Sequence, residues 1–263
     1  MSRIALAFER ARAEERKSLV AYLCAGDPSL DATERLVPAL AAAGADVIEL
    51  GVPFSDPIAD GPTIQAASQR ALDAGTTLSK VLDRVARLRR QGCAVPLVLM
   101  GYLNPIVAMG VETFCARAAE AGVDGLIVPD LPFDEASELS EGAAKHGIDL
   151  ILLAAPTTLP ERLAEIGRRT RGFLYFVSVT GVTGARAELP TDLPERLAAV
   201  KACTSVPVAV GFGIATPEQA RALSAHADAV VVGSAIVKAV DAAKGEVAPV
   251  ATLVRTLAEA LRP

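Results

Sequence analysis

Short apolar runs alternate with Ala-, Leu-, Arg- and Glu-rich stretches along nearly the whole chain. Eight runs have the length and composition of β-strands, at 18–24, 46–52, 95–102, 124–130, 149–156, 173–179, 206–213 and 228–235. Nearly all are apolar on both faces, as expected for strands that are buried on both sides. Stretches with helical spacing lie between them, at 31–43, 62–73, 78–90, 112–121, 134–145, 160–170, 192–202, 216–224 and 247–261. This repeated alternation predicts a parallel α/β sheet.

Eight strand–helix units without a linker or low-complexity segment favour one closed (β/α)8 TIM barrel over residues 1–263, a typical length for that fold. An open doubly wound sheet is the structural alternative. An additional N-terminal helix is expected before the first strand, because Ile4, Ala7, Phe8 and Ala11 fall on one helical face. The loop after the second strand, GVPFSDPIADGP, is unusually long, and barrel active sites lie in loops of this kind.

Charge and cysteine content exclude several classes of function. The net charge is −5, and acidic and basic residues are mixed along the chain, which argues against a nucleic-acid partner. No uninterrupted apolar run reaches about 18 residues, so no membrane span is expected. The N-terminus lacks the apolar core of a secretory signal, and the four cysteines contain no CxxC pair. A cytoplasmic location is therefore expected.

Glycine is concentrated at the ends of the last three predicted strands, in the runs 181–184, 211–213 and 233–234. Glycine lets backbone N–H groups approach an oxyanion closely, and the N-terminus of a following helix favours negative charge. The loops after strands 7 and 8 commonly bind phosphate in this fold. Tight turns alone would also need glycine, but three successive clusters favour a phosphate site.

The positions of the lysines and histidines argue against two kinds of aldolase. All six lysines fall in predicted helices or before the first strand, away from the barrel mouth where a Schiff base would have to form. His146 and His226 follow helices, at the opposite end of the barrel from the expected active site. No metal site is predicted, because histidine ligands would be needed near the mouth.

Carboxylate chemistry remains. Glu49 lies inside the apolar strand Val47–Gly51, where a charged side chain is costly unless it has a partner or a role. A carboxyl group in such surroundings tends to keep its proton, which suits a general acid. Asp60 lies in the long loop just beyond. An ion pair inside the barrel is the alternative for Glu49, and a helix N-cap is the alternative for Asp60.

Several segments resemble tryptophan synthase alpha subunits, in the same order and over essentially the whole chain. The most specific is IELGVPFSDPIADGPTIQ at 48–65, and the others are MGYLNPI at 100–106, GLIVPDLP at 125–132, the strand with Tyr175, GVTG at 181–184, GFGI at 211–214 and VVGSA at 231–235. The resemblance implies retro-aldol cleavage of indole-3-glycerol phosphate to indole and glyceraldehyde 3-phosphate. Glu49 would be the acid and base, and Asp60 would stabilise the charge on the indole nitrogen.

The resemblance also implies the substrate contacts. The indole pocket would be formed by Tyr22, Ile64, Met100, Ile127, Tyr175 and Phe212, although each of these could instead be ordinary barrel core. Thr183 would contact Asp60 when the loop after strand 6 closes. The phosphate would be bound by Gly184, Gly213, Gly233 and Ser234. Position 22 is often Phe in the family, so Tyr22 adds a hydroxyl group to the pocket, and the loop at 185–190 is variable in the family.

The resemblance also implies a partner subunit. Alpha subunits of this family work in an αββα heterotetramer, in which the β subunit carries pyridoxal phosphate, and no cofactor is expected in this chain. The residues that match the contact loops are Pro53, Asp56, Pro57, Asn104 and Pro105. Three alternatives are another phosphosugar-binding barrel, a stand-alone indole-3-glycerol phosphate lyase, and a chain that only activates a partner subunit.

Overall fold

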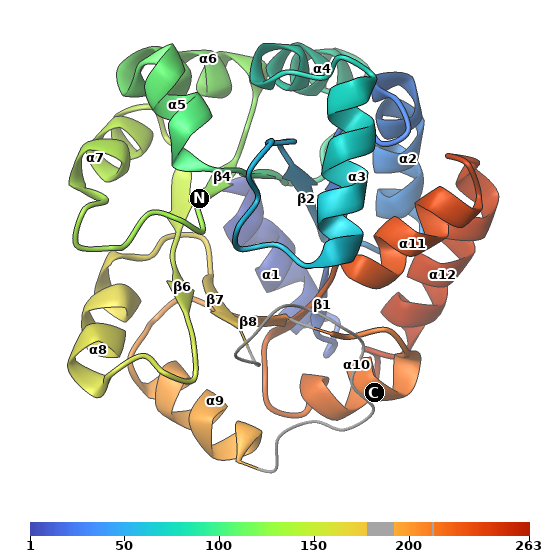
Figure 1. The fold of residues 1–263 in the computed structure, drawn as a ribbon. Helices are drawn as coiled ribbons and strands as arrows, with labels where there is room; N and C mark the ends of the chain where they lie inside the picture. The colour runs from blue at the N-terminus through green and yellow to red at the C-terminus, as the bar shows by residue number, and fades with distance from the viewer. Residues whose placement is uncertain (178–191, 212) are drawn as a thin grey trace.

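The structure is a computed structural model that describes residues 1–177, 192–211 and 213–263. Its strands form one parallel sheet in the order β5-β4-β3-β2-β1-β9-β8-β7-β6. They are β1 (Ser18–Cys24), β2 (Val47–Gly51), β3 (Leu97–Met100), β4 (Gly125–Ile127), β5 (Asp149–Ile151), β6 (Leu153–Ala154), β7 (Leu174–Val177), β8 (Val208–Gly211) and β9 (Ala229–Val232). The predicted barrel is confirmed, and its helices surround the strands (Figure 1).

The fifth predicted strand, 149–156, is interrupted, so the sheet has nine segments instead of eight. Its first part, β5, pairs with β4, and its second part, β6, pairs with β7. Leu152 lies between them, and its N–H donates to the Thr170 hydroxyl at 3.0 Å while its carbonyl accepts from the Tyr175 N–H. Because β5 and β6 are consecutive parts of one strand, the two ends of the sheet meet. This closure excludes the open doubly wound alternative.

Twelve helices occur in the described residues. They are α1 (Arg3–Ala13), α2 (Leu30–Ala42), α3 (Pro62–Asp73), α4 (Leu78–Arg90), α5 (Leu103–Met109), α6 (Val111–Ala121), α7 (Ser137–Lys145), α8 (Pro160–Arg169), α9 (Leu193–Ala202), α10 (Pro217–Ser224), α11 (Ser234–Ala242) and α12 (Val247–Glu259). The sequence ranges did not include α5 or the body of α11. Within the described part of the chain, no helix combines the length and the apolar character needed to cross a membrane.

The predicted N-terminal helix, α1, closes the barrel at the end opposite the mouth and lies behind its centre in Figure 1. Its residues Ile4 and Phe8 are buried in the barrel interior together with Val20, Val47 and Val98. The Phe8 ring packs against the Phe173 ring, with centroids 5.8 Å apart. The interior beneath the mouth is therefore filled with apolar side chains.

Side chains that directly precede strands connect neighbouring strands at this closed end. Asp46, Asp124 and Asp228 each accept a backbone N–H at or next to the start of the preceding barrel strand, from Leu19, Leu97 and Val208 respectively. Each bond satisfies a backbone donor near a strand end. In the described residues this arrangement occurs three times around the barrel. Thr170 at the end of α8 makes a related bond, to the Leu152 N–H between β5 and β6.

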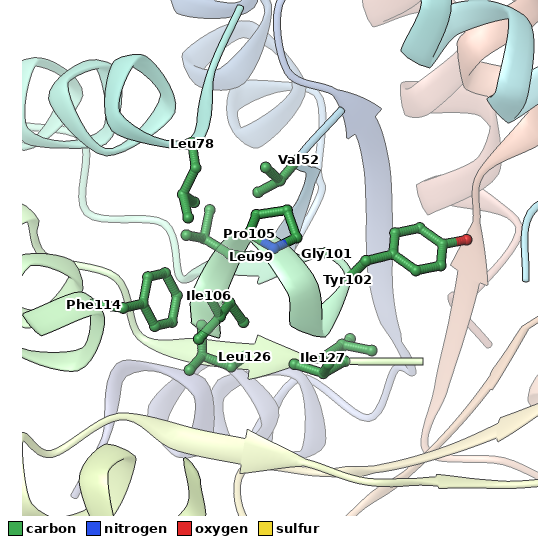
Figure 2. Close-up of a pocket in the computed structure, with 11 residues that line it drawn as sticks. Val52, Leu78, Leu99, Gly101, Tyr102, Pro105, Ile106, Phe114, Leu126 and Ile127 are labelled. Carbon is green, nitrogen blue, oxygen red and sulfur yellow. The ribbon is translucent and has the colours of Figure 1, made fainter. Parts of the chain in front are cut away.

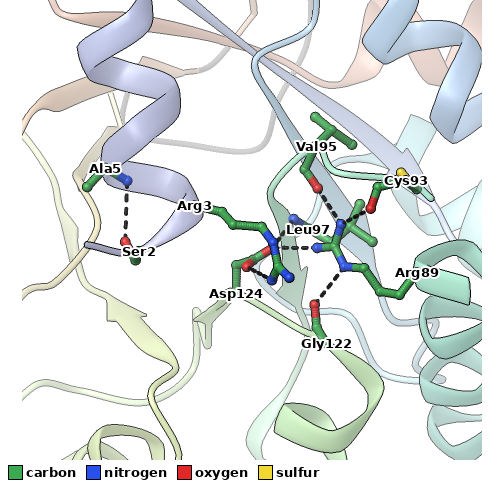
Figure 3. A network of polar contacts seen from close by, with 9 residues as sticks. All are labelled: Ser2, Arg3, Ala5, Arg89, Cys93, Val95, Leu97, Gly122 and Asp124. Atoms are coloured by element: carbon green, nitrogen blue, oxygen red, sulfur yellow. Dashed lines mark hydrogen bonds and ion pairs between the residues drawn. The ribbon is translucent and has the colours of Figure 1, made fainter.

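Asp124 connects several elements at this end of the barrel (Figure 3). Its carboxylate, 6% exposed, also forms ion pairs with Arg3 of α1 and Arg89 of α4. The Arg89 guanidinium in turn donates to the backbone carbonyls of Cys93, Val95 and Gly122. One buried carboxylate thus joins α1, α4 and two strands.

We expect Asp124→Ala to lower the free energy of unfolding by about 3 kcal/mol, because it leaves a buried N–H and a largely buried guanidinium without their partner. The control is Asp83→Ala, which removes an exposed carboxylate from α4. It should change the free energy of unfolding by less than about 1 kcal/mol. Urea denaturation of both variants measures the difference. Equal stabilities for the two variants would contradict the role assigned to Asp124.

Candidate active site

Glu49 is a buried acid at the centre of the barrel. It lies in β2 with its neighbours in register Tyr22 of β1 and Val98 of β3, and the residue is 1% exposed. Its Oε2 atom has no hydrogen-bond partner, and no ion pair with Glu49 occurs in the described residues. The alternative of a barrel-interior ion pair is therefore not supported in the part of the chain that the structure describes.

Burial and a neighbouring charge favour the protonated form of this carboxyl group. Loss of solvation raises the pKa of Glu49, the nearby Asp60 carboxylate raises it further, and the resulting pKa is about 8. At neutral pH the group therefore retains its proton. A general acid must hold a proton at the working pH so that it can donate it, and Glu49 meets this requirement.

Asp60 lies in the long loop between β2 and α3, and its carboxylate accepts a hydrogen bond from the Tyr102 hydroxyl at 2.8 Å. Gly61 is the N-cap residue of α3, so the alternative role of Asp60 as the cap is wrong. Burial raises the pKa of Asp60, and the hydrogen bond from Tyr102 opposes that shift by stabilising the charged form.

Tyr102, immediately before α5, holds the Asp60 loop in place. Its hydroxyl also accepts the Ala59 N–H at 3.0 Å, and its ring stacks on Phe54 with centroids 5.2 Å apart. The Ser68 hydroxyl of α3 bonds both the N–H and the carbonyl of Phe54. The sequence prediction missed Tyr102 as a functional residue, although it lies within the segment MGYLNPI that carries part of the family resemblance.

Two tyrosines have the same relation to a glycine on the next strand. Tyr22 lies beside Glu49 in register, and its hydroxyl would be 2.0 Å from a methyl group placed on Gly51. Tyr175 lies beside Ala209, and its hydroxyl would be 2.5 Å from a methyl group on Gly211. Both rings therefore lean across positions where only glycine leaves room, and both phenols experience the charges of Glu49 and Asp60.

The other predicted apolar contacts divide into two groups. Ile64 of α3 and Met100 of β3 pack with Tyr22 and Cys24. Ile127 is fully buried in the barrel interior, between Met100 and Ile151 in register, which favours its alternative role as core. Phe212 lies outside the described residues.

A small apolar cavity lies beside Ile127 (Figure 2). Pro105 and Ile106 of α5 and Phe114 of α6 are among the side chains that line it, while the Tyr102 ring points away from the cluster. Its volume is about 10 Å³, enough for one water molecule. This cavity is too small for the substrate. The apolar side chains that line it pack α5 and α6 against the barrel.

The predicted phosphate residues lie at the ends of adjacent strands. Gly213 follows β8 and has a φ of +74°, a conformation that favours glycine. Gly233 follows β9 and is the N-cap of α11, and Ser234 is the first residue of that helix. Strands β8 and β9 are paired, so the two loops are neighbours. Thr183 and Gly184 lie outside the described residues.

The predicted partner loops differ in exposure. Asp56 and Asn104 are exposed, Pro57 and Pro105 are half-buried, and Pro53 is buried within this chain. Pro53 therefore offers little surface to a partner in this structure.

The described residues contain no cluster of three or more histidine, cysteine or acidic side chains that would hold a metal ion. His146 caps the C-terminal end of α7 and contacts Glu112, and His226 follows α10. Both lie away from Glu49, as predicted.

Comparisons with known proteins agree with this geometry. The family model described as tryptophan synthase alpha chain matches residues 8–262. The tryptophan synthase alpha chain of Geobacter sulfurreducens is 56% identical over 238 residues, which cover 90% of this chain and 90% of the relative. That of Gluconacetobacter diazotrophicus is 52% identical over 262 residues, covering 98% and 95%.

Solved structures give the same result. The alpha subunit of tryptophan synthase from Legionella pneumophila has a TM-score of 0.91 at 39% identity, covering 99% of this chain and 98% of that one. A chain of Mycobacterium tuberculosis tryptophan synthase has a TM-score of 0.92 at 39% identity, covering 100% and 99%. The chain belongs to the tryptophan synthase alpha chain family.

Proposed function

We propose that Glu49 and Asp60 carry out, in this chain, the lyase reaction of its family, the cleavage of indole-3-glycerol phosphate to indole and glyceraldehyde 3-phosphate in tryptophan biosynthesis. The observation that supports these roles best is the Glu49 carboxyl group. It is buried in an apolar barrel, one of its oxygens has no partner among the described residues, and Asp60 is close enough to raise its pKa. An orphaned buried carboxyl is costly, and a catalytic role accounts for its retention.

The first step uses the proton that burial retains. Protonated Glu49 donates to C3 of the indole ring, and the ring becomes an indoleninium cation with its charge centred on nitrogen. This cation is the electron sink for the bond cleavage that follows. Because the pKa of Glu49 lies near 8, proton donation is available at neutral pH.

Asp60 stabilises the cation as it forms. Its carboxylate carries the opposite charge and is held in place by the Tyr102 hydroxyl at 2.8 Å. A preorganised charge of this kind acts strongly in a site of low dielectric. Tyr102 contributes as a positioning residue, because its hydroxyl is bonded to Asp60 and its ring packs on the same loop.

Cleavage then needs a base. The glycerol hydroxyl on the carbon attached to C3 loses its proton, the carbon–carbon bond breaks, and its electron pair returns to the ring. Neutral indole and the aldehyde of glyceraldehyde 3-phosphate are the products. Glu49 is a carboxylate after the first step, so it accepts this proton and is regenerated.

The phosphate is bound by the loops after β8 and β9. Gly213, Gly233 and Ser234 provide backbone N–H groups, one hydroxyl group and the N-terminus of α11. Gly184 also binds the phosphate, Thr183 contacts Asp60, and Phe212 contacts the indole ring. The indole ring contacts Tyr22, Ile64, Met100 and Tyr175, whereas Ile127 belongs to the barrel core.

The partner is a tryptophan synthase β subunit in an αββα heterotetramer, which holds pyridoxal phosphate, and the complex is cytoplasmic. This chain needs no cofactor of its own. Two exposed apolar side chains support an interface near the predicted contact loops: Ile58 is 82% exposed beside Pro57, and Val107 is 55% exposed on α5 with Asn104 and Pro105. Each adds exposed apolar surface directly beside a predicted contact residue, and exposed apolar surface is a common feature of interfaces.

Glu49→Gln is expected to lower kcat for indole release at least about 100-fold, because the amide has no acidic proton to donate. A steady-state assay with indole-3-glycerol phosphate measures the loss. The matched control is binding of indole-3-propanol phosphate, an analogue with the same ring and phosphate, which should be retained. Wild-type turnover by this variant would refute the role of Glu49.

Val107→Asp is expected to leave indole release by the isolated chain within about twofold of the parent, and to abolish most of its activation by a β subunit, because a charge is buried at the interface. Leu6→Asp on α1, at the closed end of the barrel, is the control and should leave activation intact. Equal activation of both variants would refute this interface. A parent chain that is fast alone and not activated would indicate a stand-alone lyase.

A further inference from the structure

Tyr22 lies between the phosphate end of the site, at Gly233, and the reacting carboxyl group of Glu49. Its Cβ lies 3.6 Å from a methyl group placed on Gly233, in the loop assigned to phosphate. Its hydroxyl reaches the position above Gly51, two residues beyond Glu49 on the same inward face of β2. The ring thus extends from the phosphate end of the mouth to the reacting carboxyl.

The hydroxyl at the end of this ring is available to a ligand. In the part of the chain that the structure describes, no hydrogen bond uses it, although Tyr22 is only 7% exposed and its neighbours Cys24 and Ile64 are apolar. Burial, and then the charges of Cys24, Asp60 and Glu49, raise the pKa of Tyr22 well above its usual value. The group therefore stays protonated and acts as a neutral hydrogen-bond donor, never as the base.

The substrate has a polar segment of matching position. Its phosphate and its indole ring are joined by a three-carbon linker that carries two hydroxyl groups. If the phosphate lies at Gly233 and C3 of the ring lies at Glu49, this linker must run along the Tyr22 ring. Ile64 and Met100, which pack with Tyr22, offer this linker no strong hydrogen-bonding group.

We propose that the Tyr22 hydroxyl donates a hydrogen bond to a linker hydroxyl of the bound substrate, and so makes the site selective for a hydroxylated linker. This inference rests on the proposed placement of the phosphate and of Glu49. Phenylalanine at this position would fill the same space without the donor. Gly51 is part of the arrangement, because any larger residue would displace the hydroxyl.

The test compares two ligands that differ only in the linker. Tyr22→Phe should raise KM for indole-3-glycerol phosphate about fivefold to tenfold, the usual range for one neutral hydrogen bond, with kcat within about twofold of the parent. The inhibition constant of indole-3-propanol phosphate, whose linker has no hydroxyl groups, should stay the same or decrease. The thermal unfolding midpoint should not change, since the hydroxyl has no partner in the described residues.

Three results would overturn the proposal. Equal weakening of both ligands would show that Tyr22 only packs against the substrate. Unchanged constants for both would show that the hydroxyl makes no contact, and a loss confined to kcat would show that it does not act in binding. The activity of Glu49→Gln distinguishes this failure from failure of the proposed function, because it does not depend on Tyr22.

Discussion

The buried carboxyl group of Glu49 is the constraint on which the site depends. The barrel interior beneath it is filled by apolar side chains from α1 and the strands, and in the part of the chain that the structure describes one of its oxygens has no partner. Because the folded chain binds the Glu49 proton more tightly than the unfolded chain does, protonation of this group stabilises the fold. The stabilisation is complete below about pH 4.5 and is lost as the pH rises through about 8. At neutral pH the free energy of unfolding is lower than at low pH by on the order of a few kcal/mol because of this group. The same burial keeps an acid available for the reaction.

The two ends of the barrel use carboxylates in opposite ways. At the closed end, Asp46 and Asp124 are buried but fully paired with arginines and backbone N–H groups, so their charge is compensated and they stabilise the fold. At the mouth, within the described residues, Glu49 forms no ion pair and one of its oxygens lacks a hydrogen bond, while the side-chain partner of Asp60 is the neutral Tyr102. Paired acids at one end support the rigid framework that an unpaired acid at the other end requires.

Much of the fold could be predicted from the sequence, because apolar periodicity reports burial directly. The break in the fifth strand could not, since it depends on a hydrogen bond between Leu152 and the distant Thr170. Helix α5 was missed because it is short and contains Pro105. In the site, Glu49 was recognisable as an acid within an apolar strand. The role of Tyr102 was not, because its contact with Asp60 joins residues far apart in the chain.

The proposed mechanism depends most directly on the protonation state of Glu49, and a titration of that carboxyl group by carbon-13 NMR measures it. Glu49→Gln identifies the signal by its absence. We predict a midpoint near pH 8, with the protonated form dominant at neutral pH. A midpoint near the ordinary value of 4.5 would mean that the group is ionised in the resting enzyme, and would contradict its role as the acid that begins the reaction.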